Sequence, residues 1–166
     1  EPPPLPPSPP QAPPPCSVAI DLVMVIDLSS SVGTDRPHVL EFARGIVGFF
    51  TMGSDAAQLG MVEFSSVANT VTRSSLTSDL SAISTGIDNA GGTSSSTYLS
   101  GGLELGQQVV TGTNARNGVP KVLVVMSDGV QTVRGGDNTA IAAALGIKAS
   151  GTKIIALGFG SVADAG

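Results

Sequence analysis

The chain has 166 residues, of which 41% are hydrophobic, and this supports one well-packed core and not two. Its net charge is −5, and its eight Lys and Arg residues form no basic cluster of the kind that holds a phosphate backbone. Five Phe, one Tyr and no Trp leave no stacking platform for single strands, and no apolar run approaches the roughly 20 residues of a membrane span. We therefore expect neither nucleic-acid binding nor a direct membrane span in this chain.

Proline divides the chain into two parts. Ten of the twelve prolines lie within residues 1–15, which cannot pack a core and are predicted to form a stiff polyproline II linker. Residues 16–166 are predicted to form one domain. Cys16, the only cysteine, lies at the junction, so any disulfide it forms must reach a partner outside these residues.

Short apolar runs alternate with helical patterns along the domain, which predicts an α/β fold. The near-continuous apolar run Val18–Ile26 is typical of a strand that is buried on both faces. Thr34 or Asp35 is expected to cap the next helix, with Pro37 in its first turn. An apolar stripe at helical spacing then follows: Val39, Ala43, Ile46 (or Val47) and Phe50.

The next two apolar runs are predicted to form the antiparallel edge of the sheet. They are the strands Leu59–Phe64 and Val67–Thr72, joined by a tight turn at Ser65-Ser66. Ser78 or Asp79 is expected to open a short helix to about Ile87. The later elements alternate again: a helix at Leu99–Val110, a strand at Val119–Met126, a helix at Thr139–Ala149 and a strand at Lys153–Leu157. The predicted fold is a doubly wound, mostly parallel sheet with one antiparallel edge strand and helices on both faces.

Oxygen-bearing side chains follow the ends of these predicted strands. Asp27, Ser29 and Ser31 come directly after the first strand, and Asp128 follows the strand that ends at Met126. The Ser- and Thr-rich loop 93–97 adds further hydroxyls. Because the carboxyl ends of parallel strands meet at one edge of a sheet, these loops are expected to converge. Such hard oxygen donors suit Mg²⁺, Mn²⁺ or Ca²⁺.

Four motifs in this order resemble the von Willebrand factor type A domain, the family that includes the integrin I domains. They are D-L-V-M-V-I-D-L-S-S-S-V-G (Asp21–Gly33), G-M-V-E-F-S-S (Gly60–Ser66), S-T-Y-L-S-G-G-L (Ser96–Leu103) and V-L-V-V-M-S-D-G (Val122–Gly129). The resemblance spans about Ser17–Ser161. Members usually continue with a further helix, strand and C-terminal helix, so the resemblance implies elements beyond Gly166.

The resemblance implies a metal-ion-dependent adhesion site. In this reading the hydroxyls of Ser29 and Ser31 coordinate the ion, and Asp27 and Asp128 supply negative charge directly or through water. The cation would be Mg²⁺, with Mn²⁺ or Ca²⁺ as the other candidates. An open coordination position would then accept an Asp or Glu carboxylate from a partner protein.

A threonine from the loop before the third helix completes the family's site. The family's spacing places this threonine five residues before the Gly of a Gly-Leu pair. Thr97 stands at that distance from Gly102, which makes it the predicted ligand. The Ser-rich loop is long enough to shift the register, so Thr93 stays the alternative.

Enzymatic activity is not expected. The phosphohydrolases that open with an Asp after the first strand resemble D-x-D, whereas Ser29 occupies the second acidic position here and lacks the acid–base group. The chain has neither a G-x-S-x-G elbow nor a P-loop, and its only histidine, His38, is predicted to be an exposed helix residue.

The Pro-rich segment resembles the hydroxyproline-rich glycoproteins of plant and green-algal cell walls and extracellular matrix. This resemblance implies a glycoprotein at the cell surface, in the cell wall or in the extracellular space. The predicted function is divalent-cation-dependent adhesion or assembly, with a carboxylate-bearing protein or neighbouring matrix or filament subunits as partners. The alternative is a structural scaffold domain of a wall or surface filament that binds no ligand through a metal.

Overall fold

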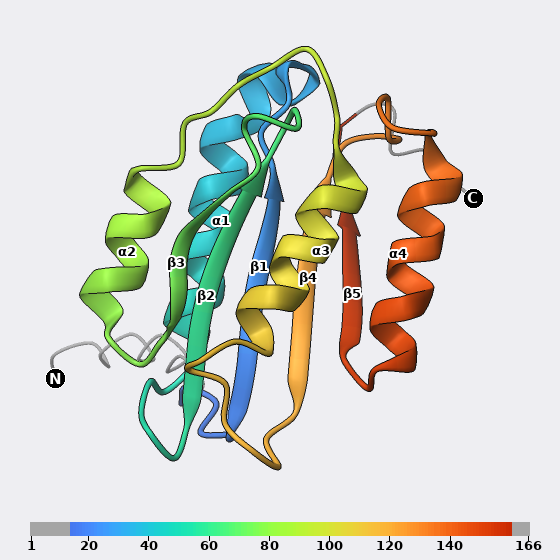
Figure 1. The fold of residues 1–166 in the computed structure, drawn as a ribbon. Helices are drawn as coiled ribbons and strands as arrows, with labels where there is room; N and C mark the ends of the chain where they lie inside the picture. Colours follow the sequence, from blue (N-terminus) through green and yellow to red (C-terminus); the bar gives the residue numbers. More distant parts are fainter. Residues whose placement is uncertain (1–13, 161–166) are drawn as a thin grey trace, which may run out of the picture.

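A five-stranded sheet forms the centre of the molecule (Figure 1). The computed structural model describes residues 14–160, so nearly all of the predicted linker lies outside the described residues. The strands lie side by side in the order β3 (Val71–Thr77), β2 (Ala57–Phe64), β1 (Ile20–Asp27), β4 (Lys121–Ser127) and β5 (Lys153–Gly158). β3 is antiparallel to β2, and the other neighbours are parallel.

Helices cover both faces of this sheet (Figure 1). α1 (Arg36–Phe49) and α2 (Leu80–Asp88) pack on one face, while α3 (Leu99–Val110) and α4 (Asp137–Ala149) pack on the other. The predicted α/β class, with a mostly parallel sheet and one antiparallel edge strand, is confirmed.

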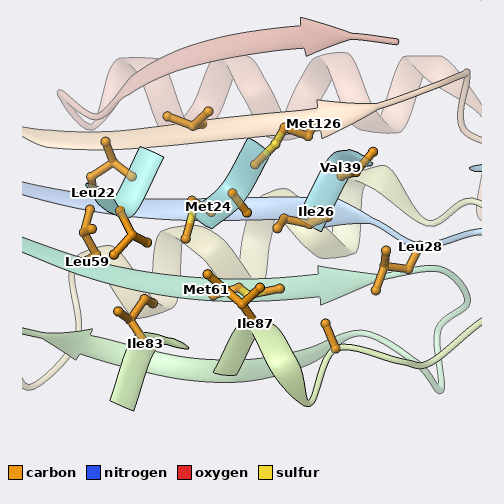
Figure 2. Close-up of a cluster of buried hydrophobic side chains, with 14 of the residues drawn as sticks. Leu22, Met24, Ile26, Leu28, Val39, Leu59, Met61, Ile83, Ile87 and Met126 are labelled. Atoms are coloured by element: carbon orange, nitrogen blue, oxygen red, sulfur yellow. The ribbon is translucent and has the colours of Figure 1, made fainter. Parts of the chain in front are cut away.

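The core of the domain has two layers, one on each side of the sheet, because β1 is buried on both faces. Leu22, Met24 and Ile26 point toward α1 and α2, among Ile83 and Ile87 of α2 (Figure 2). The alternate residues of β1 point the other way and pack against α3 and α4: Val23 and Val25. Alternation of side chains along a strand, with apolar residues at every position, requires this two-sided burial. The strand that carries Asp27 is therefore held in a rigid setting.

The predicted start of β3 was wrong. Residues 65–70 form a turn instead of a two-residue hairpin, because Ser65 N donates to Asn69 O at 3.2 Å and the Thr70 hydroxyl donates to Ser66 O at 2.8 Å. Val67, which was placed in the strand, lies in this turn and is 45% exposed. The strand runs over Val71–Thr77 in place of the predicted Val67–Thr72.

Asp35 lies at the predicted cap position before α1, with Pro37 in the first turn of the helix, but its side chain does not cap the helix. A 3₁₀ helix, η1 (Ser30–Asp35), precedes α1, and the side chain of Asp35 makes no capping hydrogen bond. Gly33 has φ = +44°, a conformation that glycine tolerates, and this bends the chain from η1 toward α1. In contrast, the Asp79 side chain accepts from Ser81 N at 2.8 Å at the start of α2, as predicted.

The chain enters the domain at the amino edge of the sheet. Cys16 N donates to Phe49 O at 2.9 Å, and Thr51 N donates to Cys16 O at the same distance. These contacts join Cys16 to the end of α1, at the opposite end of β1 from Asp27. Within residues 14–160, every helix is too short or too polar to cross a membrane.

Candidate metal centre

Asp27 is the last residue of β1 and is completely buried. Its carboxylate accepts hydrogen bonds from Ser29 N at 2.9 Å and from the Ser127 hydroxyl at 2.7 Å. The first bond folds the chain back just after the strand, which turns the following residues across the sheet edge. The second joins the ends of β1 and β4, which are neighbours in the sheet.

A chain of oxygen atoms runs from the loop after β1 to the loop after β4. The hydroxyls of Ser29 and Ser31 lie 2.9 Å apart, and Ser31 Oγ donates to Asp128 Oδ1 at 3.1 Å. Four of the five predicted site residues therefore lie together at the carboxyl edge: Asp27, Ser29, Ser31 and Asp128. This convergence follows from the parallel pairing of β1 with β4.

Thr97 is linked to this group through the loop after β4. It is 5% exposed, its N–H donates to Thr132 Oγ1 at 2.8 Å, and its carbonyl accepts from Thr132 N at 3.0 Å. Thr93 is exposed and lies on the other side, where its carbonyl accepts from Asn69 of the β2–β3 turn at 3.4 Å. Within residues 14–160, no direct hydrogen bond joins either threonine side chain to the other four residues.

Among the residues that the structure describes, the two carboxylates at this edge are buried without a basic partner. Asp27 is 0% and Asp128 4% exposed, yet none of the ion pairs within residues 14–160 includes them. Burial raises the pKa of Asp27 above 3.8; hydrogen bonds from Ser127 and Ser29 oppose this rise, and the nearby Asp128 adds to it. A buried carboxylate pair that lacks a counter-charge fits a cation, and the surrounding hydroxyls are neutral oxygen donors.

Two other buried carboxylates were missed in the sequence, and both have cationic partners. Asp21 contacts Arg116 and Lys121 at the amino edge, and Glu63 contacts Arg73 near the carboxyl edge. Both acids are 0% exposed. An acidic residue inside an apolar strand was the available signal, because a buried charge requires a partner. Asp21 and Glu63 are paired with Arg or Lys and are therefore structural carboxylates, whereas Asp27 and Asp128 are candidate ligands.

The comparison with protein families identifies this fold. The model of the von Willebrand factor type A domain matches residues 21–166. The chain belongs to this family. Domains of the von Willebrand factor type A family are modules for protein–protein interaction and adhesion, and they are generally not enzymes. They often carry a metal-ion-dependent adhesion site.

A human relative shows the same domain within a longer protein. Von Willebrand factor A domain-containing protein 2 is 31% identical over 154 residues. The match covers 89% of this chain and 19% of the human protein, so the chain spans about a fifth of that relative's length.

Solved structures share the architecture. Proximal thread matrix protein 1 from the mussel byssus is 25% identical, with a TM-score of 0.75 over 89% of this chain and 39% of that chain. A further structure of that protein has a zinc-occupied metal-ion-dependent adhesion site, and it is 26% identical with a TM-score of 0.72 over the same shares. The pilus adhesin SpaC of Lactobacillus rhamnosus GG, at 17% identity and a TM-score of 0.62, shares the fold over 85% of this chain and 24% of its own.

Proposed function

We propose that this domain binds a divalent cation at the carboxyl edge of its sheet and, through that cation, a carboxylate of a partner protein. Ser29, Ser31 and Thr97 would supply hydroxyl ligands. Asp27 and Asp128 would supply the negative charge, directly or through water. Mg²⁺ is the proposed ion, with Mn²⁺ or Ca²⁺ as alternatives, because all three take oxygen ligands.

The proposal rests on the absence of a basic partner for Asp27 and Asp128 among residues 14–160. Asp27 and Asp128 are buried and joined by hydroxyls, whereas Asp21 and Glu63 are buried and paired with Arg or Lys. Two ionised carboxylates in a low-dielectric setting repel each other unless a cation lies near them. Mg²⁺ keeps open or water-filled positions when protein oxygens fill only part of its shell, so an Asp or Glu side chain of a partner is a suitable further ligand.

The setting of the module is proposed from its relatives and from the linker. The matrix protein and the pilus adhesin with this fold favour an extracellular or cell-surface location. We also propose the division into a Pro-rich linker at 1–15 and a domain at 16–166, and the isolated bridge between Cys16 and Phe50 supports a domain that begins near Cys16. Neighbouring matrix or filament subunits are the proposed partners besides a soluble carboxylate-bearing protein.

Calorimetric titration of the chain with Mg²⁺, Mn²⁺ and Ca²⁺ tests the proposal. We expect saturable binding at one site in the wild type and none in Asp27→Ala. Asp55→Ala is the matched control, because Asp55 is an exposed aspartate in the turn before β2, at the opposite edge of the sheet. Absence of binding by the folded wild type, or equal loss in both variants, would overturn the proposal.

A scaffold domain that does not use a metal is the second candidate, because one of the similar structures is a thread matrix protein. Ser29→Ala separates the two functions. Self-association that depends on the divalent ion and disappears in Ser29→Ala, measured by sedimentation velocity with and without Mg²⁺, supports adhesion through the ion. Self-association that persists in Ser29→Ala and in EDTA supports the scaffold.

A further inference from the structure

The segment between α2 and α3, residues 89–98, passes over the carboxyl edge of the sheet (Figure 1). We call it the crossing loop, and it contains both candidate threonines. Two hydrogen bonds join it to the segment that begins with the D-x-S-x-S motif. Ser30 N donates to Ser94 O at 2.8 Å, and Arg36 Nη2 donates to Ala90 O at 2.6 Å. The position of the crossing loop therefore affects both Thr97, which lies in the loop, and the segment after β1, which is bonded to it.

Glu63 of β2 binds the backbone of this loop. It is the residue before the end of β2, and its side chain is completely buried. Glu63 Oε2 accepts from Gly91 N at 2.9 Å, and Oε1 accepts from Gly92 N at 3.0 Å. Arg73 of β3 donates to Oε1 and neutralises the carboxylate. One side chain thus binds two successive backbone amides of the crossing loop.

The fit between the loop and Glu63 leaves little space. A Cβ added at Gly92 would lie 3.0 Å from Glu63 Oε1 and 3.4 Å from Asn69 Cβ. The next turn adds a further contact, because Ser65 Oγ donates to Gly92 O at 3.0 Å. The N–H and the C=O of Gly92 are therefore both hydrogen-bonded, to Glu63 of β2 and to Ser65 just after it. Glycine allows the backbone to come this close, and a larger residue would lift the loop.

We propose that Glu63 is a positioning residue for the candidate metal centre. By fixing Gly91 and Gly92 it sets the path of the crossing loop, and hence the position of Thr97 and the hydrogen bond from Ser30 to Ser94. Residues that orient ligands from outside the coordination shell typically change metal affinity by about 10- to 100-fold when they are replaced. The inference rests on the proposed function, since its consequence is a change in cation affinity.

Glu63→Gln tests this role with little change of volume. The amide keeps one acceptor and places an NH₂ group against a backbone N–H, so one of the two amide contacts is lost. We expect the affinity for Mg²⁺ to fall by about 10-fold or more, and hydrogen exchange at Gly91, Gly92 and Ser30 to become at least about tenfold faster. The exchange readout needs no metal, so it tests the loop contact even if the wild type binds no cation.

Asp21→Asn is the matched control. Asp21 is a buried strand carboxylate with basic partners, like Glu63, but it lies six residues before Asp27 on β1, which is about 20 Å along the strand. We expect this variant to lose stability while Mg²⁺ affinity and exchange at Gly91 and Gly92 stay unchanged in the folded protein. Equal losses of affinity in the two variants would show a general effect of destabilisation and would overturn the proposal.

Gly92→Ala disturbs the same contact from the loop and leaves the Glu63 carboxylate unchanged. The added Cβ would force Gly92 away from Glu63 Oε1, so we expect weaker Mg²⁺ binding and faster exchange at Gly91 here too. If Glu63→Gln fails to fold, this variant carries the test. Wild-type exchange and wild-type affinity in a folded Glu63→Gln or Gly92→Ala protein would overturn the positioning role. If the wild type binds no cation but exchange is faster in both variants, the proposed function is wrong, whereas the contact between Glu63 and the loop is confirmed.

Discussion

The hydroxyl of Ser31 donates a hydrogen bond to the carboxylate of Asp128, a residue 97 positions later in the chain. The two residues meet because β1 and β4 lie side by side in parallel, with Met24 opposite Val124 and Ile26 opposite Met126. The candidate centre therefore exists only after this long-range pairing has formed. A cation that binds there stabilises the native state, because the unfolded chain cannot present the same oxygens.

Ser31→Ala should weaken Mg²⁺ binding by more than about tenfold, which corresponds to about 1.4 kcal/mol. Ser31 is exposed, so we expect the free energy of unfolding in EDTA to change by no more than about 1 kcal/mol. Calorimetry gives the affinity, and urea denaturation gives the stability. Ser95→Ala, at an exposed serine of the crossing loop, should keep the wild-type affinity. Unchanged binding by Ser31→Ala would remove Ser31 from the proposed ligand set.

Replacing Thr97 and Thr93 separately with alanine shows which of the two is the ligand from the crossing loop. Thr97 is buried and hydrogen-bonded to Thr132, four residues after Asp128, whereas Thr93 is exposed and contacts Asn69. We expect Thr97→Ala to lower Mg²⁺ affinity by about tenfold or more, and Thr93→Ala to leave it within about twofold. Titration of both variants under the same conditions checks this, and the reverse order would assign the ligand to Thr93.

Acid should remove the contribution of Asp21 to stability. Burial disfavours ionisation of Asp21, but hydrogen bonds from Lys121 and Arg116 outweigh this effect and hold its pKa below 3.8. A lowered pKa in the folded state means that the contribution is fully present above pH 3.8 and is lost as the pH falls through the lower folded value.

Asp21→Asn measures that contribution. At neutral pH we expect the variant to be less stable by about 3 kcal/mol, because two basic groups lose their buried partner. The difference from the wild type should shrink as the pH drops below 3.8. Urea denaturation at a series of pH values gives both curves. A difference that stays constant down to the lowest pH would show that the charge of Asp21 is not what stabilises the fold.

Two glycines in helices should respond to alanine in opposite directions. A Cβ at Gly106 of α3 would lie 2.6 Å from Val25 Cγ2, so overpacking should lower stability by about 1–3 kcal/mol. A Cβ at Gly45 of α1 meets nothing within 4 Å, so Gly45→Ala should raise stability by about 0.5–1 kcal/mol. Thermal and urea unfolding check both. Stabilisation by Gly106→Ala would mean that α3 does not need to approach β1 this closely.

The sequence predicted much of the fold because its signals are local. Apolar continuity located β1 and β4, and helical periodicity gave α3 with the bounds Leu99–Val110 that the structure has. The four residues of the hydrogen-bonded group were also predicted, since the D-x-S-x-S segment and Asp128 follow buried parallel strands. Their roles as metal ligands stay predictions.

The remainder depends on contacts between distant residues. The start of β3 was misplaced because Val67 and Val71 have the same local preference, and only the hydrogen bonds of the 65–70 turn separate them. Asp21 gave no local sign of its partners, since Lys121 lies 100 positions away. Glu63 was overlooked for the same reason, because its amide donors lie 28 and 29 positions later. Such burial is decided by tertiary packing.

The position of Cys16 has a mechanical consequence. The chain is attached at the amino edge, beside the end of α1, whereas Asp27 and Asp128 lie at the carboxyl edge. A pull between a partner bound at the carboxyl edge and the chain before Cys16 therefore acts along the strands. Cys16 and the Asp27–Ser31 segment flank the same strand, so such a load passes through the backbone of β1, which β2 and β4 hold in the sheet on either side.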